Sequence, residues 1–127
     1  MHRSHYHVFY NSTLASVVME WQGLAPSSAF REGTEQMLIQ LIEHRAHKVL
    51  ADLTHMQLIS LQDREWLQRD FLPRVFEAGL QTIAFVRSTD YYNQLSVGTV
   101  VYEIQPNQLN VNYFYDRREA EAWLCSH

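Results

Sequence analysis

Two segments that are apolar on both faces constrain the fold of this chain more than any other feature. Residues 48–53 and 82–87 place Val, Leu, Ile, Ala and Phe side chains at consecutive positions, so neither face of an extended strand would be polar. Such strands are typical of parallel sheets that are covered on both sides. We therefore expect an α/β sheet with helices packed against both faces.

The N-terminal region predicts a β-hairpin followed by an amphipathic helix. Residues 5–10 and 14–21 are typical of two strands joined by a tight turn. Ser27 and Ser28 offer an N-cap for the helix that follows. Its apolar stripe consists of Phe30, Thr34, Met37, Leu38, Leu41 and Ile42. Gly33 should weaken its first turns by about 1 kcal/mol relative to alanine.

A second helix is predicted to begin after Ser60, because Ser60 and Asp63 supply an N-cap oxygen and an acidic group in the first turn. Pro73 should kink this helix or split it, since proline cannot donate a hydrogen bond and crowds the preceding turn. Gly79 is expected to end this helix. The side chains expected to face the core are Leu61, Trp66, Leu67, Phe71, Val75 and Phe76.

The C-terminal third is predicted as helix, strand and helix. Residues 90–105 favour a strand by propensity, but a crossover between parallel strands is usually helical, and we therefore predict a helix. Residues 109–115 follow as a strand. Asp116 and Glu119 form a capping box for a last helix that should bury Ala120, Trp123 and Leu124.

These elements predict one α/β domain over residues 1–127. We expect a mainly parallel five-stranded sheet with an N-terminal β-hairpin and about four flanking helices. The chain has 127 residues, 46% of them hydrophobic, which is enough for a packed core.

Charge and cysteine content limit the functional classes. The net charge is −4 and there is no basic stripe, so nucleic acid is not an expected partner. No apolar run approaches the length of a membrane span. Cys125 is the single cysteine, and the first residues lack a signal-peptide core, so we expect a soluble protein of the reducing cytoplasm.

The order of several short motifs resembles that of STAS domains, the family of sulfate transporters and anti-sigma-factor antagonists. Asp52-Leu53-Thr54 matches the strand-ending signature of that family. The chain is more similar still to the small bacterial SpoIIAA-like proteins of this class, over nearly its full length. The matching residues are Trp21, Gly23, Asp52, Trp66, Pro73, Ala78, Gly79, Ala84, Val86, Phe114, Asp116, Ala120, Trp123 and Leu124. The resemblance implies a SpoIIAA/STAS-like fold.

One departure from the family bears on function. Anti-sigma-factor antagonists carry a phosphorylatable serine at the tip of the second helix, and this chain has Leu61 there. Leucine cannot accept phosphate. Ser60 lies one residue away, and we interpret it as an N-cap rather than as a phospho-acceptor.

No set of residues in the sequence indicates catalysis, a cofactor or a metal site. His5 and His7 share one face of a strand, without the further ligands that complete a zinc site. Asp52, His55 and Ser60 would suit a hydrolase only if a base and an oxyanion hole converged on the serine. We interpret Asp52 as a residue that orders its loop, and the chain as a protein that is not an enzyme.

The leading functional hypothesis is a non-enzymatic STAS-like interaction or regulatory module that binds another protein or itself. Its expected surface combines the loop after the first buried strand with the residues beyond the second: Asp52, Thr54, His55, Leu58, Ser60, Gln62, Asp63, Arg87, Ser88 and Asp90. The alternative is a carrier that binds a small apolar molecule or lipid between the sheet and the helix around Pro73. A hydrolase is the third hypothesis.

Overall fold

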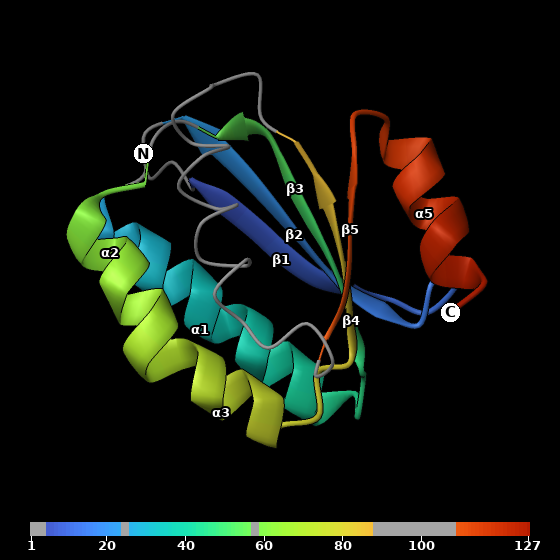
Figure 1. Cartoon of the computed structure of the whole chain (residues 1–127), viewed down its shortest axis with the longest axis horizontal. Helices are drawn as coiled ribbons and strands as arrows, with labels where there is room; N and C mark the ends of the chain where they lie inside the picture. Colours follow the sequence, from blue (N-terminus) through green and yellow to red (C-terminus); the bar gives the residue numbers. More distant parts are fainter. Residues whose placement is uncertain (1–4, 24–25, 57–58, 88–108) are drawn as a thin grey trace.

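A five-stranded mixed sheet runs through the middle of the computed structural model, which describes residues 5–23, 26–56, 59–87 and 109–127 (Figure 1). The strands lie side by side in sequence order: β1 (Tyr6–Asn11), β2 (Ser16–Gly23), β3 (Lys48–Met56), β4 (Thr82–Val86) and β5 (Asn110–Phe114). β1 and β2 form the predicted antiparallel hairpin, and each later neighbour is parallel. The prediction of an α/β fold is confirmed.

Helices cover both faces of this sheet (Figure 1). One face carries α1 (Ser27–Glu43), α2 (Leu61–Trp66), the π-helical turn η1 (Leu67–Phe71) and α3 (Leu72–Glu77). The other face carries α5 (Arg117–Cys125). A large apolar cluster lies under the first group of helices, and a smaller one lies under α5.

The double burial predicted for the central strands is confirmed. All five residues of β4 are buried, and so are Val49, Leu50 and Ala51 of β3. Successive side chains alternate between the two clusters: Ala51 belongs to the large cluster and Leu50 to the small one.

The long second helix is interrupted, as Pro73 predicted. Pro73 lies in the first turn of α3, where a missing N–H costs least. The π-helical turn η1 precedes it and joins α2 to α3. Ser60 caps α2 by accepting a 3.1 Å hydrogen bond from the Asp63 N–H. Gly79, at φ +102°, follows the end of α3.

Four predictions about local structure were wrong. β3 continues to Met56 because β2 supplies ladder partners that far, so Asp52 lies inside the strand and not at its end. Leu61 is 58% exposed, since it begins α2 beyond the edge of the core, and Ile42 is 57% exposed because it lies one step around α1 from the buried Leu41. The N-cap of α1 is Pro26, without a side-chain cap bond.

Two further expectations, that Trp66 and Trp123 belong to the core and that Asp116 and Glu119 form a capping box, are answered only in part. Trp66 and Trp123 are half-buried at the margins of the two clusters and are not fully inside. Asp116 caps α5 through the Arg118 N–H, at 3.1 Å. The helix predicted over residues 90–105 lies outside the described residues.

Gly33 has a packing role that its helix propensity does not reveal. α1 crosses the hairpin so closely that a Cβ at Gly33 would lie 2.6 Å from the tip of the Trp21 ring and 2.8 Å from Cγ of Tyr6. Those distances are far below van der Waals contact. The glycine therefore allows α1 to approach β1 and β2.

We predict that Gly33→Ala lowers the free energy of unfolding by about 1–3 kcal/mol, because overpacking outweighs the gain in helix propensity. Urea denaturation measures the change. Gln36→Ala, on the exposed side of the same helix, is the control and should be nearly neutral. A stabilised Gly33→Ala variant would show that the close approach is absent.

Candidate functional site

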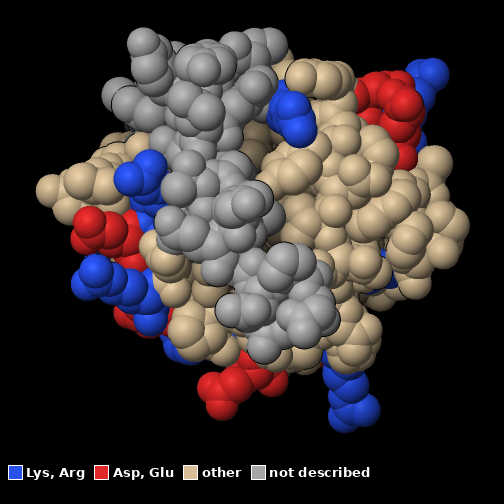
Figure 2. Space-filling model, viewed as in Figure 1, with Lys and Arg blue, Asp and Glu red and all other residues tan. Residues whose placement is uncertain are grey.

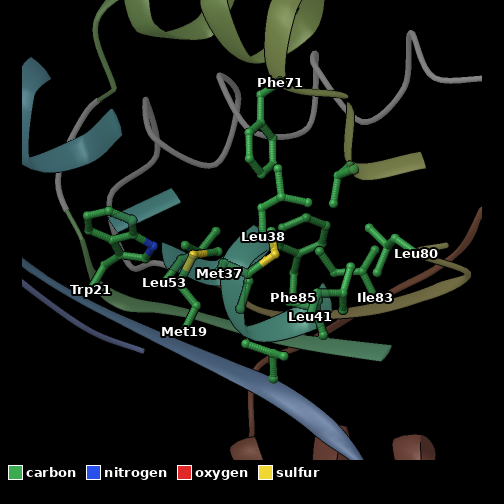
Figure 3. Close-up of a cluster of buried hydrophobic side chains, with 14 of the residues drawn as sticks. Met19, Trp21, Met37, Leu38, Leu41, Leu53, Phe71, Leu80, Ile83 and Phe85 are labelled. Atoms are coloured by element: carbon green, nitrogen blue, oxygen red, sulfur yellow. The ribbon is translucent and has the colours of Figure 1, made fainter. Parts of the chain in front are cut away.

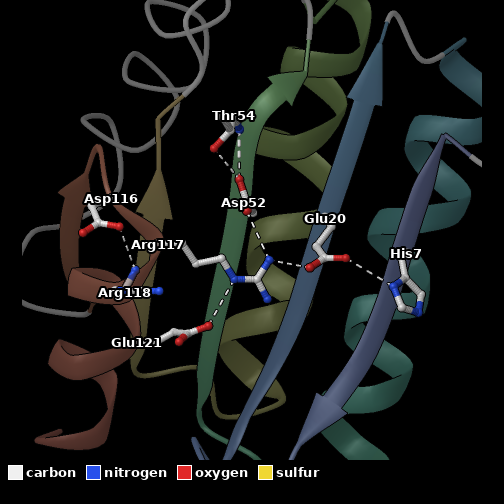
Figure 4. A network of polar contacts seen from close by, with 8 residues as sticks. All are labelled: His7, Glu20, Asp52, Thr54, Asp116, Arg117, Arg118 and Glu121. Atoms are coloured by element: carbon white, nitrogen blue, oxygen red, sulfur yellow. Dashed lines mark hydrogen bonds and ion pairs between the residues drawn. The ribbon is translucent and has the colours of Figure 1, made fainter.

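Asp52 is half-buried, and both of its carboxylate oxygens are bound within the protein. Its Oδ1 accepts hydrogen bonds from the Thr54 N–H at 3.0 Å and from the Thr54 hydroxyl at 2.6 Å. Its Oδ2 accepts from Arg117 of α5 at 3.2 Å (Figure 4). The sequence interpretation of Asp52 as a residue that orders its surroundings agrees with these contacts.

Arg117 is the centre of a network that joins three elements (Figure 4). Its guanidinium binds Glu20 of β2, Asp52 of β3 and Glu121 of its own helix, with the last contact at 3.1 Å. Burial lowers the pKa of Arg117, but the hydrogen bonds to Glu20 and Glu121 outweigh it and raise that pKa overall. The network ties α5 to the sheet.

Asp63 is the most deeply buried carboxylate among the described residues, with a side chain only 3% exposed. It accepts hydrogen bonds from the Ser27 hydroxyl at 2.9 Å and from Arg31 Nε at 3.1 Å. The Arg31 guanidinium also lies over the Trp66 ring, 5.2 Å from its centroid. Asp63 therefore joins α1 to α2, and its side chain is buried between these helices rather than presented at the surface.

Arg87 follows β4 and packs among aromatic rings. Its guanidinium lies 4.7 Å from the Tyr113 ring centroid and 5.3 Å from that of Tyr115, and it donates to the Tyr115 hydroxyl at 3.2 Å. Burial raises the pKa of Tyr113, although the charge of Arg87 opposes this. Arg87 is thus held by β5 and makes no ion pair with Asp52.

The remaining predicted residues do not form one site. His55 and Gln62 are exposed, Thr54 is bound to Asp52, and Ser60 is a helix cap. No hydrogen bond or ion pair joins Asp52, His55 and Ser60 in the described part of the chain, so the hydrolase arrangement is not assembled there. Leu58, Ser88 and Asp90 lie outside the described residues.

Lys and Arg side chains and Asp and Glu side chains both lie around the margins of the face that Figure 2 shows, and neither sign forms a patch of its own there. Nor do His, Cys, Asp and Glu side chains gather in threes in a way that suits a metal ion, as far as the described residues extend. His7 contacts Glu20 at 3.2 Å.

The feature that sequence reasoning located only roughly is an apolar cavity of about 100 Å³ between the sheet and the helices α1, η1 and α3. Figure 3 shows Met19, Met37 and Phe71 among the side chains gathered there. The described residues that line it are Met19, Trp21, Phe30, Thr34, Met37, Ala51, Leu53, Met56, Ile59, Leu67, Phe71, Leu72, Val75, Leu80, Ile83, Phe85 and Leu109. Thr34 carries a hydroxyl among these, and it donates to the Phe30 carbonyl at 2.7 Å.

Comparison with known proteins adds no identity: no protein-family model and no curated protein matches the chain. Within the described residues, no helix combines the length and the apolar character needed to cross a membrane.

We predict that Asp63→Ala lowers the free energy of unfolding by about 2–4 kcal/mol, because it removes a buried ion-pair partner and two hydrogen bonds. Chemical denaturation at neutral pH measures the loss. Asp70→Ala is the matched control, since the Asp70 side chain is 57% exposed and pairs with Arg74 only within one helix turn; it should cost less than about 0.5 kcal/mol. Equal effects would contradict a structural role for Asp63.

Proposed function

We propose that this chain binds a small apolar ligand in the cavity between the sheet and the helices α1, η1 and α3, and that it is not an enzyme. The observation that supports the proposal is the lining of that cavity: its described residues are apolar except for a threonine whose hydroxyl is already bonded. A cavity lined by apolar side chains offers water few hydrogen-bond partners and suits a small apolar guest.

The side chains around the cavity suit a guest of variable shape. Met19, Met37 and Met56 supply three of the four methionines of the chain. Methionine is unbranched and polarizable, so it adapts to irregular neighbours. Leu67 and Phe71 are the first and last residues of η1, and π-helical turns occur frequently at functional sites. These features support a short alkyl or aromatic group as the ligand.

We propose as well that the chain is a SpoIIAA/STAS-like domain. The order of its motifs supports this class, and so does the α/β sheet with helices on both faces. The class leaves the activity open, because unrelated functions share one fold. The apolar cavity, and not the resemblance, therefore supports the carrier hypothesis.

We predict that Ala51→Val lowers the affinity for a small apolar probe at least about tenfold, or 1.4 kcal/mol, by occupying the cavity. Benzene is the probe, and the methyl NMR signals of Met19, Met37 and Met56 report its binding. The same substitution should leave stability unchanged or raise it by up to about 1 kcal/mol, since it fills empty space.

Ala84→Val is the matched control for this experiment. Ala84 is as fully buried as Ala51, but it faces the small cluster on the other side of the sheet. The added methyl groups should destabilise the protein by about 1–3 kcal/mol and leave probe binding intact. A wild-type protein that gives no benzene-induced shifts would overturn the proposal.

A second candidate function is protein binding through the start of α2. Leu61 is a large apolar residue that is 58% exposed, next to the exposed Gln62. Leu61 also occupies the position that the resemblance assigns to partner switching. Single exposed apolar residues are common on protein surfaces, so this candidate is supported by the position of Leu61 in the resemblance and not by its exposure.

We predict that Leu61→Asp abolishes co-precipitation of a partner from a lysate of the source cell without lowering stability by more than about 0.5 kcal/mol. Ile42→Asp is the matched control, because Ile42 is equally exposed on α1. A partner that is retained by Leu61→Asp, or lost equally with Ile42→Asp, would exclude this surface.

A further inference from the structure

Among the described residues, β1 forms one margin of the sheet and pairs with β2 alone (Figure 1). The register with β2 runs without interruption from Tyr6 opposite Trp21 to Asn11 opposite Ser16. There is no bulge to turn this edge away. An edge of this kind presents backbone groups that a further strand can bind.

The hydrogen-bonding pattern identifies which residues present those groups. The Gln22 N–H donates to the His5 carbonyl at 3.0 Å, so the His5–Gln22 pair is a hydrogen-bonded pair of the antiparallel ladder. Such pairs alternate with pairs whose backbone groups point away from the partner strand. Tyr6, Val8 and Tyr10 therefore direct their N–H and C=O groups outward from the sheet.

β1 lacks the residues that usually protect an edge strand from pairing with a further strand. Natural edges are blunted by charged side chains, by proline or by bulges. β1 reads Tyr-His-Val-Phe-Tyr-Asn and contains no Lys, Arg, Asp, Glu or Pro. Its one titratable imidazole, on His7, already contacts Glu20.

α1 holds the edge in a fixed conformation. The Tyr6 hydroxyl donates to Glu32, and the Tyr10 ring stacks on His44 with 4.1 Å between centroids. A strand that is ordered before binding loses less conformational entropy when it pairs.

We infer that β1 binds β1 of a second copy of this chain in an antiparallel pair, with the two-fold axis at Val8. This register places Val8 opposite its own counterpart, Tyr6 opposite the second copy's Tyr10, and His7 opposite the second copy's Phe9. All outward backbone groups of Tyr6, Val8 and Tyr10 then find partners, and no two charged side chains face each other.

The second copy is favoured over an unrelated peptide because the strand is complementary to itself in this register. Aromatic and β-branched residues meet directly across the two strands, which are the pairs that stabilise antiparallel sheets. The product is an isologous dimer with one continuous sheet through both copies. The inference does not depend on the proposed ligand.

Sedimentation of the full chain at roughly 100 µM, a concentration that populates a complex with a micromolar Kd, tests the proposal. The wild type should sediment at twice the chain mass of 15.0 kDa. His7→Lys puts a charged side chain on the edge beside Glu20, and it should weaken dimerisation at least about tenfold. Gln62→Lys, which adds the same charge on α2, should remain dimeric.

Val8→Pro provides a second test. Because the Val8 N–H points outward, proline removes a donor of the interface without removing a hydrogen bond to β2. The variant should be folded by circular dichroism and monomeric. If it does not fold, His7→Lys decides the outcome alone.

Crosslinking tests the register. In a Cys125→Ser background, Val8→Cys should form a disulfide-linked dimer on oxidation, because opposed Cα atoms about 5.5 Å apart can be bridged. Ile42→Cys in the same background should not. A monomeric wild type, a dimer that persists in His7→Lys, or a dimer without the crosslink at position 8 would each overturn the proposal.

Discussion

The burial of β3 on both faces and along both edges is the constraint on which the rest of the structure depends. β3 is hydrogen-bonded to β2 on one side and to β4 on the other. Its apolar residues alternate between two clusters, so each face needs its own cover. The helices α1 to α3 and the single helix α5 provide that cover, and their positions follow from this requirement.

The same constraint explains the polar network on the α5 side. Asp52 lies in the middle of a strand whose neighbours are buried, where an unpaired carboxylate would be costly. Arg117 supplies the counter-charge and also binds Glu20, so one guanidinium holds two strands and a helix together. Ion pairs tie α5 to the sheet on this face, whereas the opposite face carries the larger apolar cluster and a cavity.

Features governed by local chemistry were predictable from the sequence, and features that depend on distant partners were not. The Ser60 cap, the interruption near Pro73, the Gly79 stop and the Asp116 cap follow from neighbouring residues alone. Asp63 looks like an ordinary acidic residue of a first helical turn, and only the folded chain brings Ser27 and Arg31 to it.

The cavity lies beyond prediction for a related reason. A void is the space that packed side chains leave, so it depends on the volumes and directions of residues from most elements at once. Pro73 indicated the region because it interrupts the helix that covers this face. It gave no indication that Ala51, a small residue on β3, would face the void while Ala84 would face the opposite cluster.

The proposed ligand cavity and the proposed dimer edge are one strand apart, which gives a physical route between them. Val8 of β1 lies opposite Met19 of β2, and the Tyr6 ring lies 5.6 Å from that of Trp21. Met19 and Trp21 both line the cavity. A second copy that orders β1 therefore restricts the two cavity residues behind it, so dimerisation and ligand binding should be thermodynamically coupled through this hairpin. The coupling is reciprocal, and benzene should then shift the monomer–dimer equilibrium of the wild type but not that of Ala51→Val.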